Sequence, residues 1–173
     1  YAYSETRVGT SGIYVNLEST NPDKVLLSGA SKLGGIDPFP FFSVPGLISP
    51  TAFDVFPGAP AITDDYIIAF KGNYPEGNTG VFYRVLSDEE AGGYANYVTL
   101  IANTNTVIPN SGNCLGGSSS TFGSTAPPSA ALDYNRINQI VFVGLDNEQE
   151  PTCGGIYRAP AVLGGNLTVL VGL

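Results

Sequence analysis

The sequence contains no histidine, and only 7 of its 173 residues are lysine or arginine. Without histidine, the usual serine and cysteine hydrolase triads cannot be assembled. Against 15 acidic residues, the 7 cations leave a net charge of −8, which argues against nucleic acid or an anionic membrane surface as a partner. No apolar run approaches the roughly 20 residues that span a bilayer, and no signal peptide is recognisable, so we expect the first residue to follow a processing site.

Motifs that carry catalysis are also missing. No glycine-rich phosphate loop of the form G-x-x-x-x-G-K-[ST] occurs. The absence of both histidine and a C-x-x-C pair argues against zinc, and no two carboxylates stand out as a glycosidase pair. The sequence therefore predicts neither an enzyme nor a cofactor, and it indicates no catalytic residue.

The residues that are abundant favour an all-β fold. Hydrophobic residues make up 43% of the chain and charged residues 13%, which is the opposite of a disordered composition. The 22 glycines and 13 prolines, among many β-branched and aromatic residues, are typical of short strands joined by turns. No stretch shows sustained helical periodicity, and the length suffices for one domain with a core.

A strand–loop–strand pattern recurs along the chain, at residues 66–84 and 138–158, with a clipped copy at residues 1–15. The segments G-I-Y (12–14), G-V-F (80–82) and G-I-Y (155–157) align, and the copies lie roughly 70 residues apart, as expected for four-stranded units with long loops. We therefore predict one repeat domain, which divides into a partial unit 1–11, unit one 12–79, unit two 80–154 and a partial unit 155–173.

Other positions align between the copies. Phe53 matches Phe122, and A-F-K-G (69–72) matches V-F-V-G (141–144). The segment V-L-L (25–27) is matched with V-T-L (98–100) and L-T-V (167–169).

These motifs resemble those of secreted bacterial tandem-repeat proteins with an NxxGxxAF-type motif and a recurring G-I-Y start. The run L-I-A-N-T-N-T-V-I-P (100–109) and the endings I-I-A-F (67–70) and Q-I-V-F (139–142) carry the resemblance, although the glycine of the motif is absent. The family has no assigned function for most members. The resemblance implies a propeller-like or sandwich-like array of four-stranded antiparallel units in a protein that is extracellular or at the cell surface.

The repeat also suggests a partner for each of the two cysteines. Cys114 lies in a long loop of unit two and Cys153 in the loop that follows its last strand, and both loops can lie at the same end of a unit. We predict a disulfide between them, with two free thiols or half of a metal site as the alternatives, and a disulfide implies an oxidising compartment.

The two partial units predict self-assembly. A four-stranded unit needs neighbours to cover its faces. We expect the terminal strands to pair with another chain and to close a ring or grow a filament, unless the chain is part of a longer array. The residues expected in these strands are Tyr1, Ala2, Tyr3, Leu167, Val169 and Val171.

Two further sites are considered. Asp146, Asn147 and Glu148 form an acidic loop that offers oxygen ligands to calcium, with a solvated loop as the alternative. The 10 tyrosines suggest a glycan-binding pocket lined by tyrosine and carboxylates as an alternative function, including a carbohydrate-active β-propeller. The main prediction is a non-catalytic, secreted structural or interaction protein.

Overall fold

The computed structural model describes residues 2–7, 10–15, 24–28, 53–65, 67–85, 98–114, 120–162 and 164–173. This part of the chain is all-β, as predicted, and all of its strand pairs are antiparallel. Within it, no helix is long and apolar enough to cross a membrane.

The strands form three sheets of three, four and five strands. The first sheet has the order β1-β2-β3, made of β1 (Ala2–Arg7), β2 (Thr10–Val15) and β3 (Lys24–Ser28). The second has the order β4-β5-β6-β7, made of β4 (Ala61–Ile62), β5 (Ile67–Tyr74), β6 (Asn78–Val85) and β7 (Thr99–Asn103). The third has the order β12-β11-β10-β8, with β9 also paired to β10, and consists of β8 (Ser124–Thr125), β9 (Ser129–Leu132), β10 (Asn138–Leu145), β11 (Gly154–Pro160) and β12 (Thr168–Gly172).

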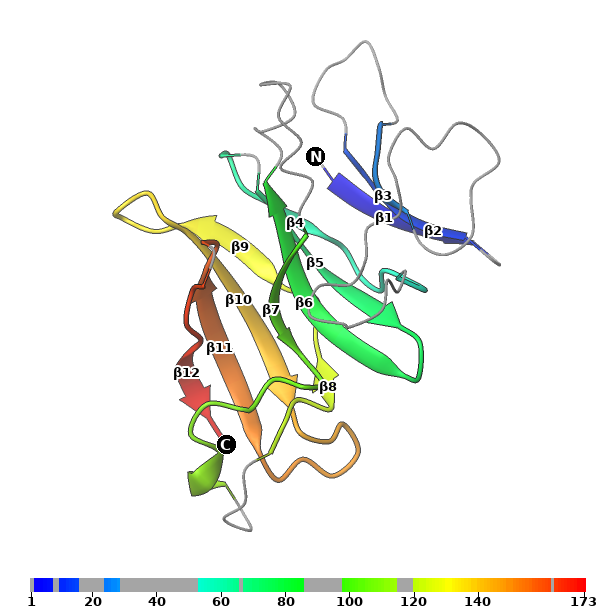
Figure 1. The fold of residues 1–173 in the computed structure, drawn as a ribbon. Coiled ribbons are helices and arrows are strands. Elements are labelled where there is room, and N and C mark those ends of the chain that lie inside the picture. The colour runs from blue at the N-terminus through cyan, green and yellow to red at the C-terminus, as the bar shows by residue number, and fades with distance from the viewer. Residues whose placement is uncertain are drawn as a thin grey trace.

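The second sheet lies between the other two and contributes one face to each of two cores (Figure 1). Residues on one face, such as Phe70, cluster with Ile13 of β2. Residues on the opposite face, such as Val81, cluster with Phe142 and Tyr157 of the third sheet. Because side chains alternate along a strand, the apolar run of β5 supplies both cores.

Each of the second and third sheets carries a trio of buried aromatic residues in the same arrangement. The trios are Phe53, Phe70 and Phe82 in the second sheet, and Phe122, Phe142 and Tyr157 in the third. In each trio the first ring meets the third edge-on with centroids 5.0 Å apart, and the centroids of the second and third rings are 5.7 Å apart. Such edge-to-face contacts are favourable beyond the area that they bury.

A glycine lies beneath the first ring of each trio. A Cβ atom at Gly72 would lie 2.6 Å from the Phe53 ring, and one at Gly144 would lie 2.4 Å from the Phe122 ring. The glycines of A-F-K-G and V-F-V-G are therefore required by the close approach of a ring to the strand.

In each sheet, the strand that follows the G-I-Y-type segment (β3, β7 or β12) contains a bulge at the same position of the motif. The register shifts between Ile13 and Tyr14, between Val81 and Phe82, and between Ile156 and Tyr157. Each shift falls between the second and third residues of the G-I-Y-type segment. An extra residue on the partner strand is the defining feature of a β-bulge.

The register corrects one predicted match. Val25 pairs with Tyr14, in the place that Leu100 takes opposite Phe82 and Val169 takes opposite Tyr157. The segment V-L-L (25–27) therefore matches the other copies with a shift of two residues from the predicted alignment. Each sheet also spans one of the predicted unit boundaries, because the strand that precedes each G-I-Y-type segment pairs with the strand that contains it.

Candidate functional site

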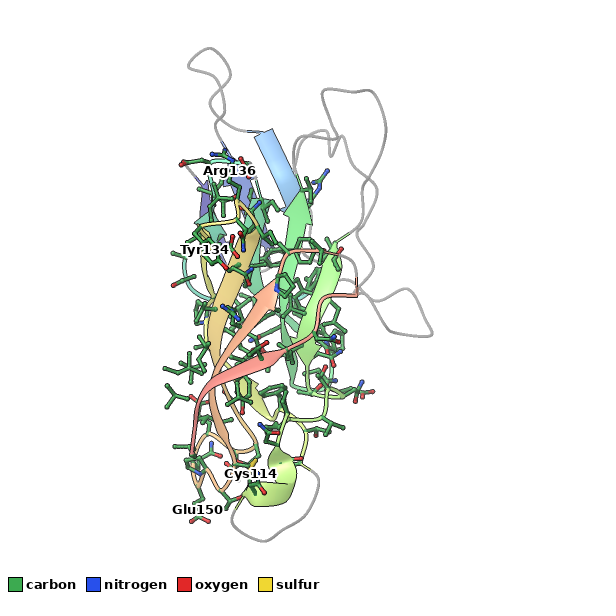
Figure 2. The ribbon with its side chains drawn as sticks, turned by 90° about the vertical axis from the view of Figure 1, so that its left-hand side faces the viewer. Cys114, Tyr134, Arg136 and Glu150 are labelled. Carbon is green, nitrogen blue, oxygen red and sulfur yellow. A yellow bond between two sulfur atoms is a disulfide. The ribbon has the colours of Figure 1, made fainter. Side chains whose placement is uncertain are left out.

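A disulfide joins Cys114 to Cys153, as the sequence predicts, with their Cα atoms 5.1 Å apart. It connects the short 3-10 turn η2 (Ser111–Asn113) to the loop between β10 and β11. Cys153 is fully buried in the core between the second and third sheets. Figure 2 shows Cys114 and Glu150 at one end of the molecule, and Tyr134 and Arg136 at the other.

The acidic loop is held together by its own hydrogen bonds. Asp146 accepts three backbone N–H groups, from Asn147, Thr152 and Cys153, at 2.9 to 3.0 Å, and its second oxygen accepts the Thr152 hydroxyl. The side-chain oxygen of Asn147 accepts the backbone N–H groups of the two residues that follow Glu148.

These hydrogen bonds bear on the calcium hypothesis. Both oxygens of Asp146 and the side-chain oxygen of Asn147 already have donors, and Glu148 accepts a hydroxyl from Ser124 at 3.4 Å. Among the residues that the structure describes, no three acidic or cysteine side chains lie close enough to hold a metal ion. The loop is therefore built as a closed turn, and it gives the calcium hypothesis no support.

The ionised form of Asp146 stabilises this turn. Burial raises the pKa of its carboxyl group, but the hydrogen bonds from Thr152, Cys153 and Asn147 outweigh that effect, and the net pKa is lowered. A lowered pKa in the folded state gives a contribution to stability that is complete above the unfolded-state pKa and is lost as pH falls through the folded-state pKa.

We therefore expect Asp146→Ala to reduce the dependence of stability on pH in the acidic range. The wild-type protein will lose stability as pH falls below about 4, the ordinary aspartate pKa, and the variant will lose less over the same interval. Urea unfolding at neutral and acidic pH measures both. Glu150→Ala, on the same loop, is the control, since Glu150 accepts none of these hydrogen bonds. Equal pH dependence in Asp146→Ala and wild type would contradict the assignment.

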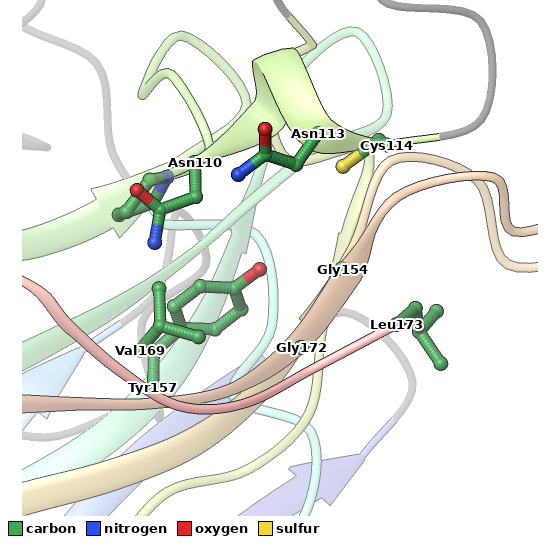
Figure 3. A pocket seen from close by; sticks show the side chains of 9 residues that line it. Asn110, Asn113, Cys114, Gly154, Tyr157, Val169, Gly172 and Leu173 are labelled. Atoms are coloured by element: carbon green, nitrogen blue, oxygen red, sulfur yellow. The ribbon is translucent and has the colours of Figure 1, made fainter.

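A pocket of about 220 Å³ lies beside the disulfide, between η2 and the strands β11 and β12. Figure 3 shows the amides of Asn110 and Asn113 on one side of it, and the ring of Tyr157 with Val169 on the other. Burial raises the pKa of the Tyr157 hydroxyl, and the charge of Asp146 raises it further, so this group stays a neutral hydrogen-bonding group.

The pocket differs from the glycan site that the sequence predicts. No aspartate or glutamate side chain lines it, and Tyr157 is its single tyrosine. Sequence reasoning missed Asn110 and Asn113, which lie in a loop that looks like plain low-complexity sequence. The one available signal was the asparagine at 110, because asparagine tolerates the left-handed conformation that it adopts there (φ 63°).

The predicted assembly residues lie at the edges of the first and third sheets. Ala2 and Tyr3 are in β1, and Val169 and Val171 are in β12. Leu167 precedes β12 and packs against the core, and Tyr1 lies outside the described residues. Each of β1 and β12 pairs with one neighbour, and no strand in the described part of the chain pairs with its outer edge.

Exposed apolar side chains gather on and around β12. Leu170 is 47% exposed, Val171 58% and Leu173 71%, and Val143 in β10 is 42% exposed. Val143 pairs with Ile156, which in turn pairs with Val171. Val143, Ile156 and Val171 therefore form a row across three strands, on the face of the third sheet that points away from the second.

Comparison with known proteins gives no match to a family model, to a curated protein or to a solved structure. The resemblance drawn from the motifs therefore stays a prediction, and the function is argued from the surfaces described above.

Proposed function

We propose that the chain is a non-catalytic structural or interaction protein, extracellular or at the cell surface, that self-assembles into a ring or a filament. The observation that carries this proposal is the run of exposed apolar residues on the edge strand β12. An unpaired, apolar edge strand is a template for association that monomeric proteins usually blunt with charge or proline. In β12 the sequence T-V-L-V-G contains neither.

The edge of β1 adds support at the other end of the sheet series. In the second and third sheets, the strands β5 and β10 each have an additional partner, β4 and β9. β1 pairs with β2 in the same register as β5 with β6, and no described strand occupies the place of β4 or β9 beside it. We propose that its backbone groups pair there with a strand from another chain.

The three sheets also support a propeller-like array. They share the bulge position, and two of them share the aromatic trio and its glycine. Units of this kind bury their faces against neighbours in series. The disulfide agrees with an oxidising, extracellular location. The pocket gives the glycan-binding alternative no specific support.

The proposal is tested by the oligomeric state of the protein. We expect assemblies in light scattering and in negative-stain electron microscopy, and we expect Val171→Lys to raise the concentration required for assembly by about tenfold or more, since burying a charge is costly. Val107→Lys is the matched control, because Val107 is similarly exposed (54%) but belongs to no strand of the third sheet. A wild-type chain that stays monomeric at all accessible concentrations would contradict the proposal.

A further inference from the structure

The outer face of the third sheet has a counterpart on the second sheet that is fully buried at two of its three positions. In the third sheet, Val143, Ile156 and Val171 form a row across β10, β11 and β12. The matching row in the second sheet is Lys71, Val81 and Ala102, across β5, β6 and β7. In both sheets the first residue of the row directly precedes the strand glycine, and the register shifts directly after the second residue of the row. The two rows therefore occupy equivalent positions.

The comparison shows how much of the outer face lacks a cover. Val81 and Ala102 are both 0% exposed, because the third sheet lies over them. Val171, at the position of Ala102, is 58% exposed. Ile156, at the position of Val81, is half-buried, and Val143 is 42% exposed at the position where the second sheet has the half-buried Lys71.

The bulge enlarges this apolar surface. Its extra residue is Ile101 in β7 and Leu170 in β12. Ile101 packs against the core between the second and third sheets, whereas Leu170 is 47% exposed. Arg158, whose position corresponds to the buried Tyr83, is exposed beside the apolar row. An apolar centre with an arginine at its margin is the composition of a protein interface.

The kind of surface that covers such a face is also visible within the chain. The second sheet's row is covered by the face of the third sheet that carries the aromatic trio. The pair Phe142–Tyr157 of that trio has a register counterpart in the first sheet, where Tyr3 pairs with Tyr14. The described residues form only three sheets, and none of them lies beyond the first (Figure 1).

From this we infer that the outer face of β10, β11 and β12 stacks on the β1–β2–β3 sheet of a second copy of the chain. This inference rests on the proposed self-assembly and specifies its surface as a sheet face, in continuation of the stacking within the chain, and not the edge of β12 alone. The two surfaces differ, so the contact is head-to-tail, and it produces a ring where the rotation closes and a filament where it does not.

The test uses Val143→Asp, because Val143 lies two strands away from the edge of β12 and does not take part in edge pairing. We expect the concentration required for assembly to rise by about tenfold or more. Val107→Asp is the control for added charge, and Val143→Ile is expected to assemble like wild type. Far-UV circular dichroism and the thermal midpoint establish that each variant is folded, and Arg158→Glu provides a second position on the face, in the central strand β11.

A mixing experiment tests the head-to-tail geometry. A Val143→Asp chain has a blocked outer face but an intact β1–β2–β3 sheet, so it is expected to cap assemblies of wild-type protein and to reduce their mean size when added in a small proportion. Assembly of Val143→Asp at the wild-type concentration would overturn the stacked face and leave edge pairing in place. Loss of assembly without capping would overturn the head-to-tail geometry. A monomeric wild type would overturn the proposed function itself.

Discussion

Replacing Phe122 with alanine is expected to lower the free energy of unfolding by about 3 to 5 kcal/mol, the range for truncating an aromatic residue in a core. The side chain is 0% exposed, and its ring centroid lies 5.0 Å from that of Tyr157 and 5.8 Å from that of Phe142. The ring also lies directly over Gly144, which has no side chain to fill the space left behind. Urea denaturation followed by circular dichroism measures the loss.

Two matched variants give this result its meaning. Tyr134→Ala removes an aromatic ring that is 94% exposed, so it is expected to change the free energy of unfolding by less than about 0.5 kcal/mol. Phe53→Ala removes the corresponding ring of the second sheet, which is also 0% exposed, and is expected to cost as much as Phe122→Ala. A loss below about 1 kcal/mol at Phe122 would show that the trio is not a main part of the core.

The sequence alignment matched the members of the two trios position by position, because these positions depend on local spacing. A glycine two residues after a phenylalanine in a strand, and a G-I-Y-type segment after the next loop, recur in two copies. In the structure these residues meet in the same register, and Phe53 and Phe122, matched by alignment alone, contact equivalent glycines. A period of two residues fixes which side chains share a face, so this part of the core can be read from the pattern.

The grouping of strands into sheets could not be read in the same way. Periodicity identifies strands but does not say which strands pair across a long loop. The shift of two residues at Val25 has the same origin, since the bulge adds a residue and the apolar run V-L-L fits several registers. The uncovered row at Val143 and Val171 likewise depends on which sheet covers which, and that is a property of packing alone.

The features of the candidate site also differ in whether the sequence predicts them. The disulfide could be predicted because the two cysteines lie in loops that can reach the same end of a unit. The closed turn around Asp146 could not, because the pattern of acidic residues is compatible with either a metal loop or a turn that satisfies its own backbone. The choice is made by the backbone N–H groups of Thr152 and Cys153, which point at the carboxylate only once the loop has folded.

Removing the disulfide is expected to cost about as much stability as removing Phe122. Cys114 and Cys153 are separated by 39 positions, and closing a loop of that length restricts the unfolded chain by an amount equivalent to about 4 kcal/mol at 25 °C. The variant Cys114→Ala/Cys153→Ala is preferred to serine, because Cys153 is fully buried and a hydroxyl there would need a hydrogen-bond partner. Urea unfolding of the double variant, beside wild type with and without a thiol reductant, measures the loss.

The position of the disulfide predicts a second effect, which distinguishes loss of the covalent link from a general loss of packing. The backbone N–H of Cys153 donates to the carboxylate of Asp146, and the backbone N–H of Asp146 donates to the carbonyl oxygen of Cys153. One end of the disulfide is therefore fixed in the closed turn. The other end follows η2, where Asn113 and the preceding Asn110 line the pocket. Without the bridge, amide hydrogen exchange is therefore expected to rise at residues 110–114 while residues 146–153 keep most of their protection. Wild type in reductant must match the double variant within about 1 kcal/mol if the covalent link is the cause. Unchanged stability in both would show that packing alone holds η2 against β11 and β12.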